Sequence, residues 1–113
     1  MKTLSLVFRE IDKSSFDRIK NGEKTIETRA GLPEYNVIEP GDELKISCGE
    51  DEINKKVVEV NHFSSLEELI DKIGLEDIMA AGTTRDEAVA RWNSFPGYPE
   101  RISKYGIIAW RLK

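Results

Sequence analysis

The sequence has few of the residues that build metal centres and thiol sites. It contains one cysteine, Cys48, and one histidine, His62, among 113 residues. A single cysteine excludes an internal disulfide and a thiolate metal cluster, and His62 has no second ligand at metal-binding spacing. We therefore predict no metal site and no cofactor. Cys48 is interpreted as a small apolar strand residue, and His62 as a structural histidine.

The sequence also lacks a long hydrophobic run. No segment approaches the roughly 18 apolar residues that a transmembrane helix needs. The apolar stretch near the N-terminus ends at Arg9, too early for a secretory signal. No glycine-rich phosphate loop or nucleotide-binding fingerprint is present. These absences predict a cytoplasmic protein with no membrane partner, and the length predicts one domain, residues 1–113, with its own hydrophobic core.

What the chain does contain is charge, distributed unevenly. There are 17 basic and 21 acidic side chains, a net charge of −4. Residues 1–30 carry seven basic and five acidic groups, residues 31–80 carry four and thirteen, and residues 81–113 carry six and three. Two interpretations stay open. In the first, the two ends of the chain meet and present a basic face. In the second, the acidic middle is simply a solvated surface, and charge alone favours this second interpretation.

Hydrophobic periodicity predicts the order strand, helix, strand, strand, strand, helix, helix, strand. Residues 30–40 are expected to form a loop, 49–54 a polar turn and 95–99 a break after the last helix. This pattern predicts an α+β fold with a mixed, curved sheet or small β-barrel and helices packed outside it. The predicted elements cover residues 3–8, 14–21, 24–29, 43–48, 56–63, 65–73, 84–94 and 105–112.

Local signals mark several helix ends. Ser14 or Ser15 is expected to cap the first helix, and Asn21-Gly22 to end it, because glycine tolerates the left-handed conformation found after helices. Thr84 and Glu87 have the spacing of a capping box at the start of the last helix.

The strand predicted at residues 24–29 carries the most polar chemistry. Alternation places Thr25, Glu27 and Arg29 on one face, and Lys24, Ile26 and Thr28 on the other, with Ile26 in the core. The long side chain of Lys24, at the start of the strand, can reach either side. Arginine can bind phosphate in a bidentate manner, and a glutamate can accept a hydrogen bond from a base amine or act as a general base. The alternative is an ordinary exposed strand face whose charged side chains pair with one another. The residues alone favour this alternative.

Aromatic and basic residues alternate near the C-terminal end. This combination suits stacking on unpaired bases while phosphates are held. Trp92 lies on the apolar face of its helix and is more often a core residue. Tyr98, in a segment rich in glycine and proline, is the better binding candidate, together with Arg101. The set comprises Arg91, Trp92, Phe95, Tyr98, Arg101, Lys104 and Tyr105.

The run Gly22-Glu23-Lys24-Thr25-Ile26-Glu27-Thr28-Arg29, placed after a short helix, resembles the signature of the ASCH domain family within the PUA-like superfamily. Similarity continues in order along nearly the whole chain, at Pro40-Gly41-Asp42, residues 57–69 and residues 105–109. The resemblance implies a small mixed PUA-like β-barrel with flanking helices and a ligand cleft lined by residues 22–29.

Family members are associated with RNA binding, RNA modification and translation-linked regulation, and some small members are enzymes. One branch hydrolyses the amide of an acetylated cytidine, and others have been assigned ribonuclease activity. The amidohydrolase branch uses the motif lysine, a threonine three residues later and a glutamate from the following helical region. Lys24 matches the lysine, but Glu27 occupies the threonine position. Glu76 and Glu87 are the candidates for the glutamate.

Three hypotheses follow. The first is an RNA- or nucleotide-binding domain of RNA metabolism or translation-linked regulation. The second is a small hydrolase of modified nucleosides or RNA, with Lys24 and Glu27 as catalytic residues. The third is a protein-interaction or regulatory domain that uses the acidic middle segment, residues 31–80. The residues expected to bind the ligand are Lys24, Thr25, Glu27, Arg29, Tyr98 and Arg101.

Overall fold

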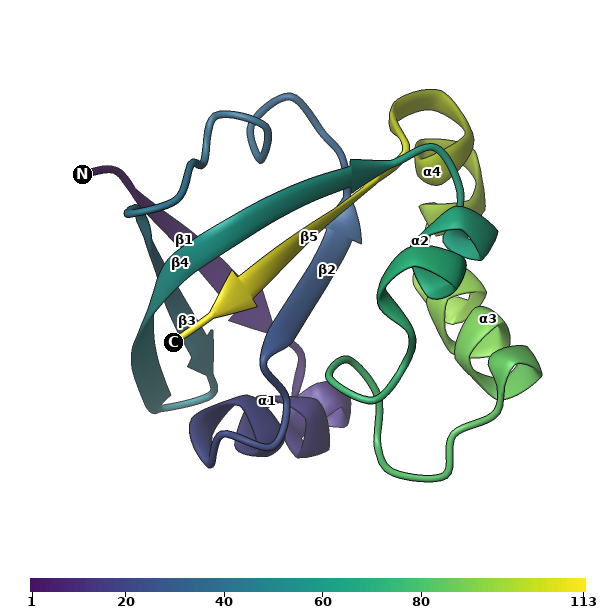
Figure 1. Ribbon diagram of the computed structural model, residues 1–113. Helices are drawn as coiled ribbons and strands as arrows, with labels where there is room; N and C mark the ends of the chain where they lie inside the picture. The colour runs from purple at the N-terminus through teal and green to yellow at the C-terminus, as the bar shows by residue number, and fades with distance from the viewer.

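The computed structural model describes all residues from 1 to 113. The predicted α+β class is confirmed, with five strands, four α-helices and a short 3₁₀ helix at Glu10–Asp12 (Figure 1). None of the helices combines the length and apolar character that a membrane span requires. The strands are β1 (Thr3–Phe8), β2 (Ile26–Ala30), β3 (Glu43–Cys48), β4 (Asp51–Phe63) and β5 (Ile107–Leu112). The helices are α1 (Lys13–Lys20), α2 (Leu66–Ile73), α3 (Arg85–Ser94) and α4 (Tyr98–Tyr105).

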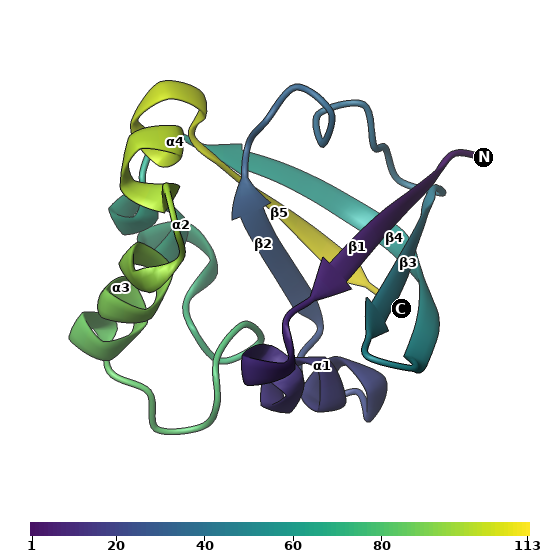
Figure 2. The same ribbon diagram turned by 180° about the vertical axis from the view of Figure 1, so that it is seen from behind.

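The strands form one curled sheet in the order β1-β3-β4-β5-β2. β1 runs parallel to β3, and the other neighbouring pairs are antiparallel. The sheet curls because the long β4 pairs with β3 through its first part and with β5 through its second. A register irregularity between Val57 and Glu59 separates the two parts, as expected of a bulge that bends a strand. β1 and β2 remain as edges, which leaves a half-barrel open between them (Figures 1 and 2).

The two faces of the half-barrel contribute to two separate hydrophobic cores. Successive strand residues point to opposite faces, so Ile108 and Trp110 of β5 lie in the inner core, whereas Ile107 and Ala109 lie in the outer one. Phe16 brings α1 onto the inner core. The outer core lies under α2, α3 and α4, which form a layer beside β5 and β2 (Figure 1).

Most of the local signals predicted from the sequence are confirmed by the structure. Ser65 caps α2 by accepting a hydrogen bond from the backbone of Glu68, and Thr84 and Glu87 form the predicted capping box of α3. Cys48 is buried in the inner core as a free thiol, as expected.

The predicted serine cap of α1 is wrong. The helix begins at Lys13, so Ser14 lies inside its first turn, and the N-cap residue is Asp12. Asp12 makes no side-chain capping bond, because two arginines engage its carboxylate.

Helix α4 was not predicted from the sequence. The expected break after α3 is present, since Gly97 has a φ angle of +76°. Pro99 occupies the first turn of the new helix, where a missing backbone N–H breaks no helical hydrogen bond. Ile102 is the one buried residue of α4. The segment was expected to be a loop because glycine and proline residues at 96–99 punctuate it.

The predicted turn at residues 49–54 is also too long. β4 begins at Asp51, and the acidic residues there belong to a strand. Asp51 forms an ion pair with Lys13 at 3.2 Å, and Glu52 lies 3.6 Å from Lys45. The polarity of this segment therefore reflects an exposed, ion-paired strand rather than a long turn.

Two glycines have similar backbone angles but different surroundings. Comparing them separates the cost of backbone strain from the cost of steric overlap when a side chain is added. Gly74 and Gly106 follow α2 and α4 with φ angles of +86° and +74° and extended ψ angles, a region that glycine alone occupies readily. A Cβ atom at Gly74 would meet nothing within 4 Å, whereas one at Gly106 would overlap the carbonyl oxygen of Phe63.

We expect Gly74→Ala to lower the free energy of unfolding by about 1–3 kcal/mol through strain. Gly106→Ala should cost about 1–3 kcal/mol more, because the new methyl group is forced against backbone. Urea denaturation of both variants measures the difference. Equal losses would contradict the close approach of the β4 end to Gly106.

Candidate functional site

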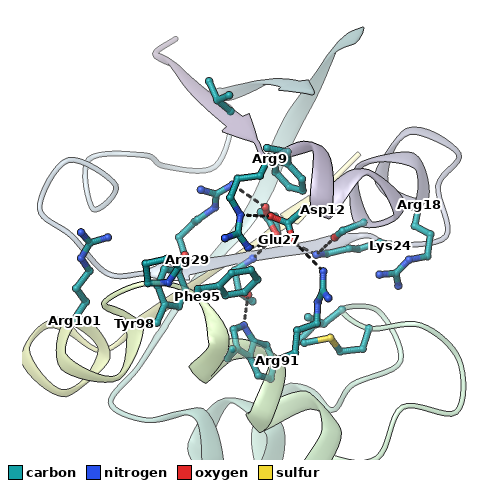
Figure 3. A pocket seen from close by; sticks show the side chains of 18 residues that line it. Arg9, Asp12, Arg18, Lys24, Glu27, Arg29, Arg91, Phe95, Tyr98 and Arg101 are labelled. Atoms are coloured by element: carbon teal, nitrogen blue, oxygen red, sulfur yellow. Dashed lines mark hydrogen bonds and ion pairs between the residues drawn. The ribbon is translucent and has the colours of Figure 1, made fainter. Parts of the chain in front are cut away.

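A cavity of about 300 Å³ lies where the half-barrel is open between β1 and β2. Its walls come from β1, α1, β2, α3 and α4, so the first thirty residues and the segment 78–101 line one space (Figure 3).

Glu27 lies at the centre of this group of side chains, with 3% of its surface exposed (Figure 3). It is paired across the sheet with Trp110 of the inner core, so Glu27 and Arg29 point into the half-barrel. Its Oε1 lies 3.1 Å from the Lys24 ammonium and accepts a hydrogen bond from the Thr28 backbone at 3.0 Å. Its Oε2 accepts from Arg29 Nη2 at 3.4 Å. Both carboxylate oxygens are therefore engaged within the protein.

Lys24 reaches the same space from outside the strand. β2 begins at Ile26, two positions later than predicted, so strand alternation does not direct Lys24 to the opposite face. Its backbone N–H donates to the carbonyl oxygen of Arg18 at 2.9 Å, and its ammonium donates to Ser15 Oγ at 3.0 Å. Helix α1 thereby holds Lys24 beside Glu27.

These surroundings keep Glu27 ionised. Burial by itself raises the pKa of the Glu27 carboxyl, but the positive charges of Lys24 and Arg29 more than reverse this effect, so its pKa lies below the ordinary 4.5. Burial likewise opposes the charge of Arg29, and the Glu27 carboxylate still raises the pKa of Arg29 above its ordinary value. At neutral pH Glu27 is an acceptor of hydrogen bonds and not a proton donor.

A second carboxylate, that of Asp12, joins the two sides of the cavity. It accepts a hydrogen bond from Arg9 Nε at 2.8 Å and one from Arg91 Nη2 at 3.3 Å. Arg9 follows β1 and Arg91 lies on α3, so these bonds connect opposite ends of the chain. Both guanidinium groups lie over the Phe95 ring, 5.2 Å and 5.8 Å from its centroid, within cation–π range.

Two further arginines, Arg18 and Arg101, line the cavity and are held by no carboxylate, unlike the other four basic residues. They lie on opposite sides of it (Figure 3). Six basic side chains and two carboxylates give the lining a net formal charge of +4, whereas the whole chain carries −4. All six come from residues 1–30 and 81–113, so the two ends do form a basic face, the interpretation that charge alone disfavoured.

Aromatic rings border these charges. The rings of Phe95 and Tyr98 are 5.0 Å apart at a tilt of 58°, and Arg29 lies over Phe8 at 5.2 Å. Burial raises the pKa of Tyr98, which keeps its phenol protonated and able to donate a hydrogen bond. The cavity therefore combines cations with aromatic surface.

Five of the six predicted binding residues line the cavity, namely Lys24, Glu27, Arg29, Tyr98 and Arg101. Tyr98 does so as the first residue of α4, not as part of a loop. Thr25 does not line it. The backbone of Thr25 is bonded to Asp77 and Leu112. Its hydroxyl is buried without a hydrogen-bond partner.

Arg9, Asp12, Ser15 and Arg18 were not predicted as site residues. The excess of basic groups in residues 1–30 was a signal for the two arginines. Nothing local marks Ser15, since its partner Lys24 lies outside α1. Asp12 has Arg9 as a local partner, but its bond to Arg91 spans 79 residues.

Neither candidate for the third amidohydrolase residue lines the cavity that contains Lys24. Glu87 closes the capping box of α3, and Glu76 lines a second hollow with Arg18 and Glu23. Trp92 is 2% exposed and donates to Thr28 Oγ1 at 2.9 Å, in agreement with its predicted core position. No group of three or more His, Cys, Asp or Glu side chains is placed to hold a metal ion.

The fold is shared with other solved proteins. The hypothetical protein PH0355, in a crystal structure, matches 100% of this chain over 98% of its own length, with a TM-score of 0.84 and 27% sequence identity. PF0455 from Pyrococcus furiosus, in a solution NMR structure, matches 98% of this chain over 96% of its own, with a TM-score of 0.75 and 22% identity. No family model and no curated protein matches the sequence. These likenesses establish the half-barrel with its helices as a recurring fold.

The ion pairs of Glu27 make a stability prediction that depends on pH. Glu27→Gln leaves Lys24 and Arg29 without a counterion, and we expect a loss of about 3–5 kcal/mol in the free energy of unfolding at pH 7. Because the folded-state pKa of Glu27 is lowered, its stabilisation is present above the unfolded value and is lost as pH falls through the folded value. The difference between wild type and variant should therefore narrow as the pH falls below about 4.5.

Chemical denaturation between pH 3 and pH 7 measures this difference. Glu34→Gln is the control, since Glu34 is exposed in the loop after β2, and it should change stability by about 0.5 kcal/mol or less. A loss at Glu27 that stays the same at every pH would show that the carboxylate charge does not contribute.

Proposed function

We propose that this chain is an RNA- or nucleotide-binding domain of the ASCH type, and that its ligand occupies the cavity above residues 24–29. The observation that carries the proposal is the convergence of six basic side chains and only two carboxylates around about 300 Å³ in a protein of net charge −4. The half-barrel with flanking helices is interpreted as PUA-like.

Electrostatics favours an anionic ligand here. Six cations brought together in a concave, partly buried space repel one another, and the two carboxylates relieve this only in part. Burial of Lys24 and Arg29 strengthens the field, because water screens them poorly. A phosphate group satisfies both the charge and the hydrogen-bonding capacity of arginine.

The aromatic border favours a nucleotide over a bare anion. Phe95 and Tyr98 lie beside the arginines, and a base stacked on an aromatic ring contributes about 1–3 kcal/mol. The charged groups and rings therefore match the two parts of a nucleotide, its phosphate and its base.

The ASCH interpretation is supported by where its signature lies. Lys24, Glu27 and Arg29 of the signature all line the cavity, although Lys24 precedes the strand that carries the other two. A conventional exposed strand face would not bring these side chains to a common buried space.

The hydrolase alternative receives less support. Glu27 is engaged by Lys24, Arg29 and the Thr28 backbone, so a role as general base requires an ion pair to break. We expect no release of cytidine from N4-acetylcytidine, as measured by chromatography, with Lys24→Ala as the control. Release that Lys24→Ala abolishes would favour the enzyme instead. Within the acidic middle segment, Asp51 and Glu52 are ion-paired with Lys13 and Lys45, which leaves fewer free carboxylates for the interaction alternative.

The binding proposal predicts a salt-dependent affinity for short single-stranded RNA. In a fluorescence anisotropy titration, the logarithm of affinity should fall linearly with the logarithm of salt concentration, by about 0.7 for each phosphate contact. The double variant Arg18→Gln with Arg101→Gln should reduce this slope and weaken binding at low salt by about ten-fold or more. Both side chains are at least partly exposed and unpaired, so the fold should persist.

The matched control is Lys72→Gln, which removes one exposed cation of α2 that lines neither hollow. It should leave both slope and affinity unchanged. Binding that does not weaken with salt, or that survives the double variant undiminished, would refute the proposal.

A further inference from the structure

We infer that the cavity selects a phosphomonoester, the phosphate at the end of an RNA chain or on a free nucleotide, over the phosphodiesters inside an RNA chain. This inference rests on the proposed function and specifies which chemical form of the ligand the site takes.

The size of the cavity limits the ligand to about one nucleotide. Its volume of about 300 Å³ is at the lower end of the range for small-molecule sites. The positive charge must therefore be met within one nucleotide and not by a run of successive phosphates.

The charge of the lining matches the end of a chain better than its interior. Asp12 and Glu27 each hold two cations, and Arg18 and Arg101 add two that no carboxylate holds. The net formal charge of the lining is +4. A phosphodiester brings a single negative charge per nucleotide, whereas a phosphomonoester carries about −1.5 to −2 at pH 7 and offers three acceptor oxygens.

The neighbouring surface opposes a chain that continues past Arg18. The second hollow shares Arg18 and Met79 with the cavity. The other charged residues that line it are Glu23 and Glu76. With Arg18 as the one cation, the lining of the second hollow has a net formal charge of −1. A phosphate backbone leaving the cavity on this side would meet like charge, so the cationic path ends at Arg18 while Arg101 lies on the opposite side (Figure 3). A ligand that terminates inside the cavity avoids this repulsion.

The experiment compares one short RNA sequence with a 5′-phosphate, with a 3′-phosphate, and with hydroxyl groups at both ends, in direct titrations. Cytidine monophosphate, cytidine and inorganic phosphate are measured in parallel. We expect one of the two phosphorylated RNAs to bind about ten-fold more tightly than the hydroxyl-ended RNA. Whichever phosphorylated RNA binds more tightly identifies the end that the cavity recognises. Cytidine monophosphate should bind more tightly than either cytidine or inorganic phosphate, since both parts of the nucleotide contribute.

The pH dependence supplies a second readout. Affinity for the phosphorylated ligand should rise several-fold from about pH 5.5 to 7.5, because the second ionisation of a phosphomonoester has a pKa near 6. The hydroxyl-ended RNA should show no such rise. The cavity contains no histidine, the side chain that ordinarily titrates in this interval. Its titratable and charged groups are Arg9, Asp12, Arg18, Lys24, Glu27, Arg29, Arg91, Tyr98 and Arg101.

Two double variants test the inference, one at the unpaired arginines of the cavity and one at the carboxylates of the second hollow. Arg18→Gln with Arg101→Gln should reduce the preference for a phosphorylated end, whereas Lys72→Gln should leave it unchanged. Glu23→Gln with Glu76→Gln removes the opposing charge of the second hollow, and we expect it to strengthen binding of hydroxyl-ended RNA and so reduce the preference. Both glutamates are exposed, so this variant should fold.

The outcomes separate this inference from the proposed function. Hydroxyl-ended RNA that binds as tightly as both phosphorylated forms, with the expected salt dependence, overturns the inference and leaves RNA binding intact. Inorganic phosphate that binds as tightly as cytidine monophosphate overturns recognition of a nucleotide. Failure of every RNA and nucleotide to bind overturns the inference and the proposed function together.

Discussion

One carboxylate, buried between two basic side chains, organises the cavity. Glu27 is removed from water by the half-barrel, which disfavours a charge unless it is paired and hydrogen-bonded. Lys24, Arg29 and the Thr28 backbone provide that pairing. The dependence is mutual, because loss of the carboxylate leaves two cations in a poorly hydrated space. Ser15 extends the cluster to α1, so the same contacts that satisfy Glu27 also set the position of the helix relative to β2.

The sheet is open between β1 and β2, and the charged side chains of the cluster lie at this opening. β2 has two buried faces of opposite character, since Ile26 and Ala30 enter the outer core while Glu27 and Arg29 face the interior. A barrel closed between β1 and β2 would enclose the polar residues with no contact to water. At the open edge Arg29 keeps partial exposure. Asp12 holds Arg9 and Arg91 in a second cluster, which also has one carboxylate and two cations. The result is a concave surface on which basic side chains are already oriented, so a ligand orders few of them on binding.

The sequence predicted the elements whose own residues carry a strong signal. Alternation marked β1, β3 and β5, and the capping box of Thr84 and Glu87 marked the start of α3. Predictions failed where a distant partner outweighs local preference. Asp12 occupies the N-cap position of α1 in place of a serine, and its carboxylate binds Arg91, 79 residues away, instead of capping the helix. Asp51 and Glu52 look like a turn but are held in β4 by pairing with β3. α4 was not predicted because the glycine and proline residues at 96–99 favour a loop when only the local sequence is considered.

The sequence by itself determined the chemistry that is available: a short polar run with Lys24, Glu27 and Arg29, and an excess of basic residues at both ends of the chain. It also determined that Ile26 is buried, because alternation is a local property of a strand. Only the tertiary structure decided that Lys24 shares a cavity with Glu27, that Thr25 does not, and that Arg9, Arg18, Arg91 and Arg101 surround the same space. The physical reason is that the curl imposed by β4 and the packing of α1 against the half-barrel create these contacts. Electrostatic interaction depends on distance in space, which the order of residues along the chain does not state.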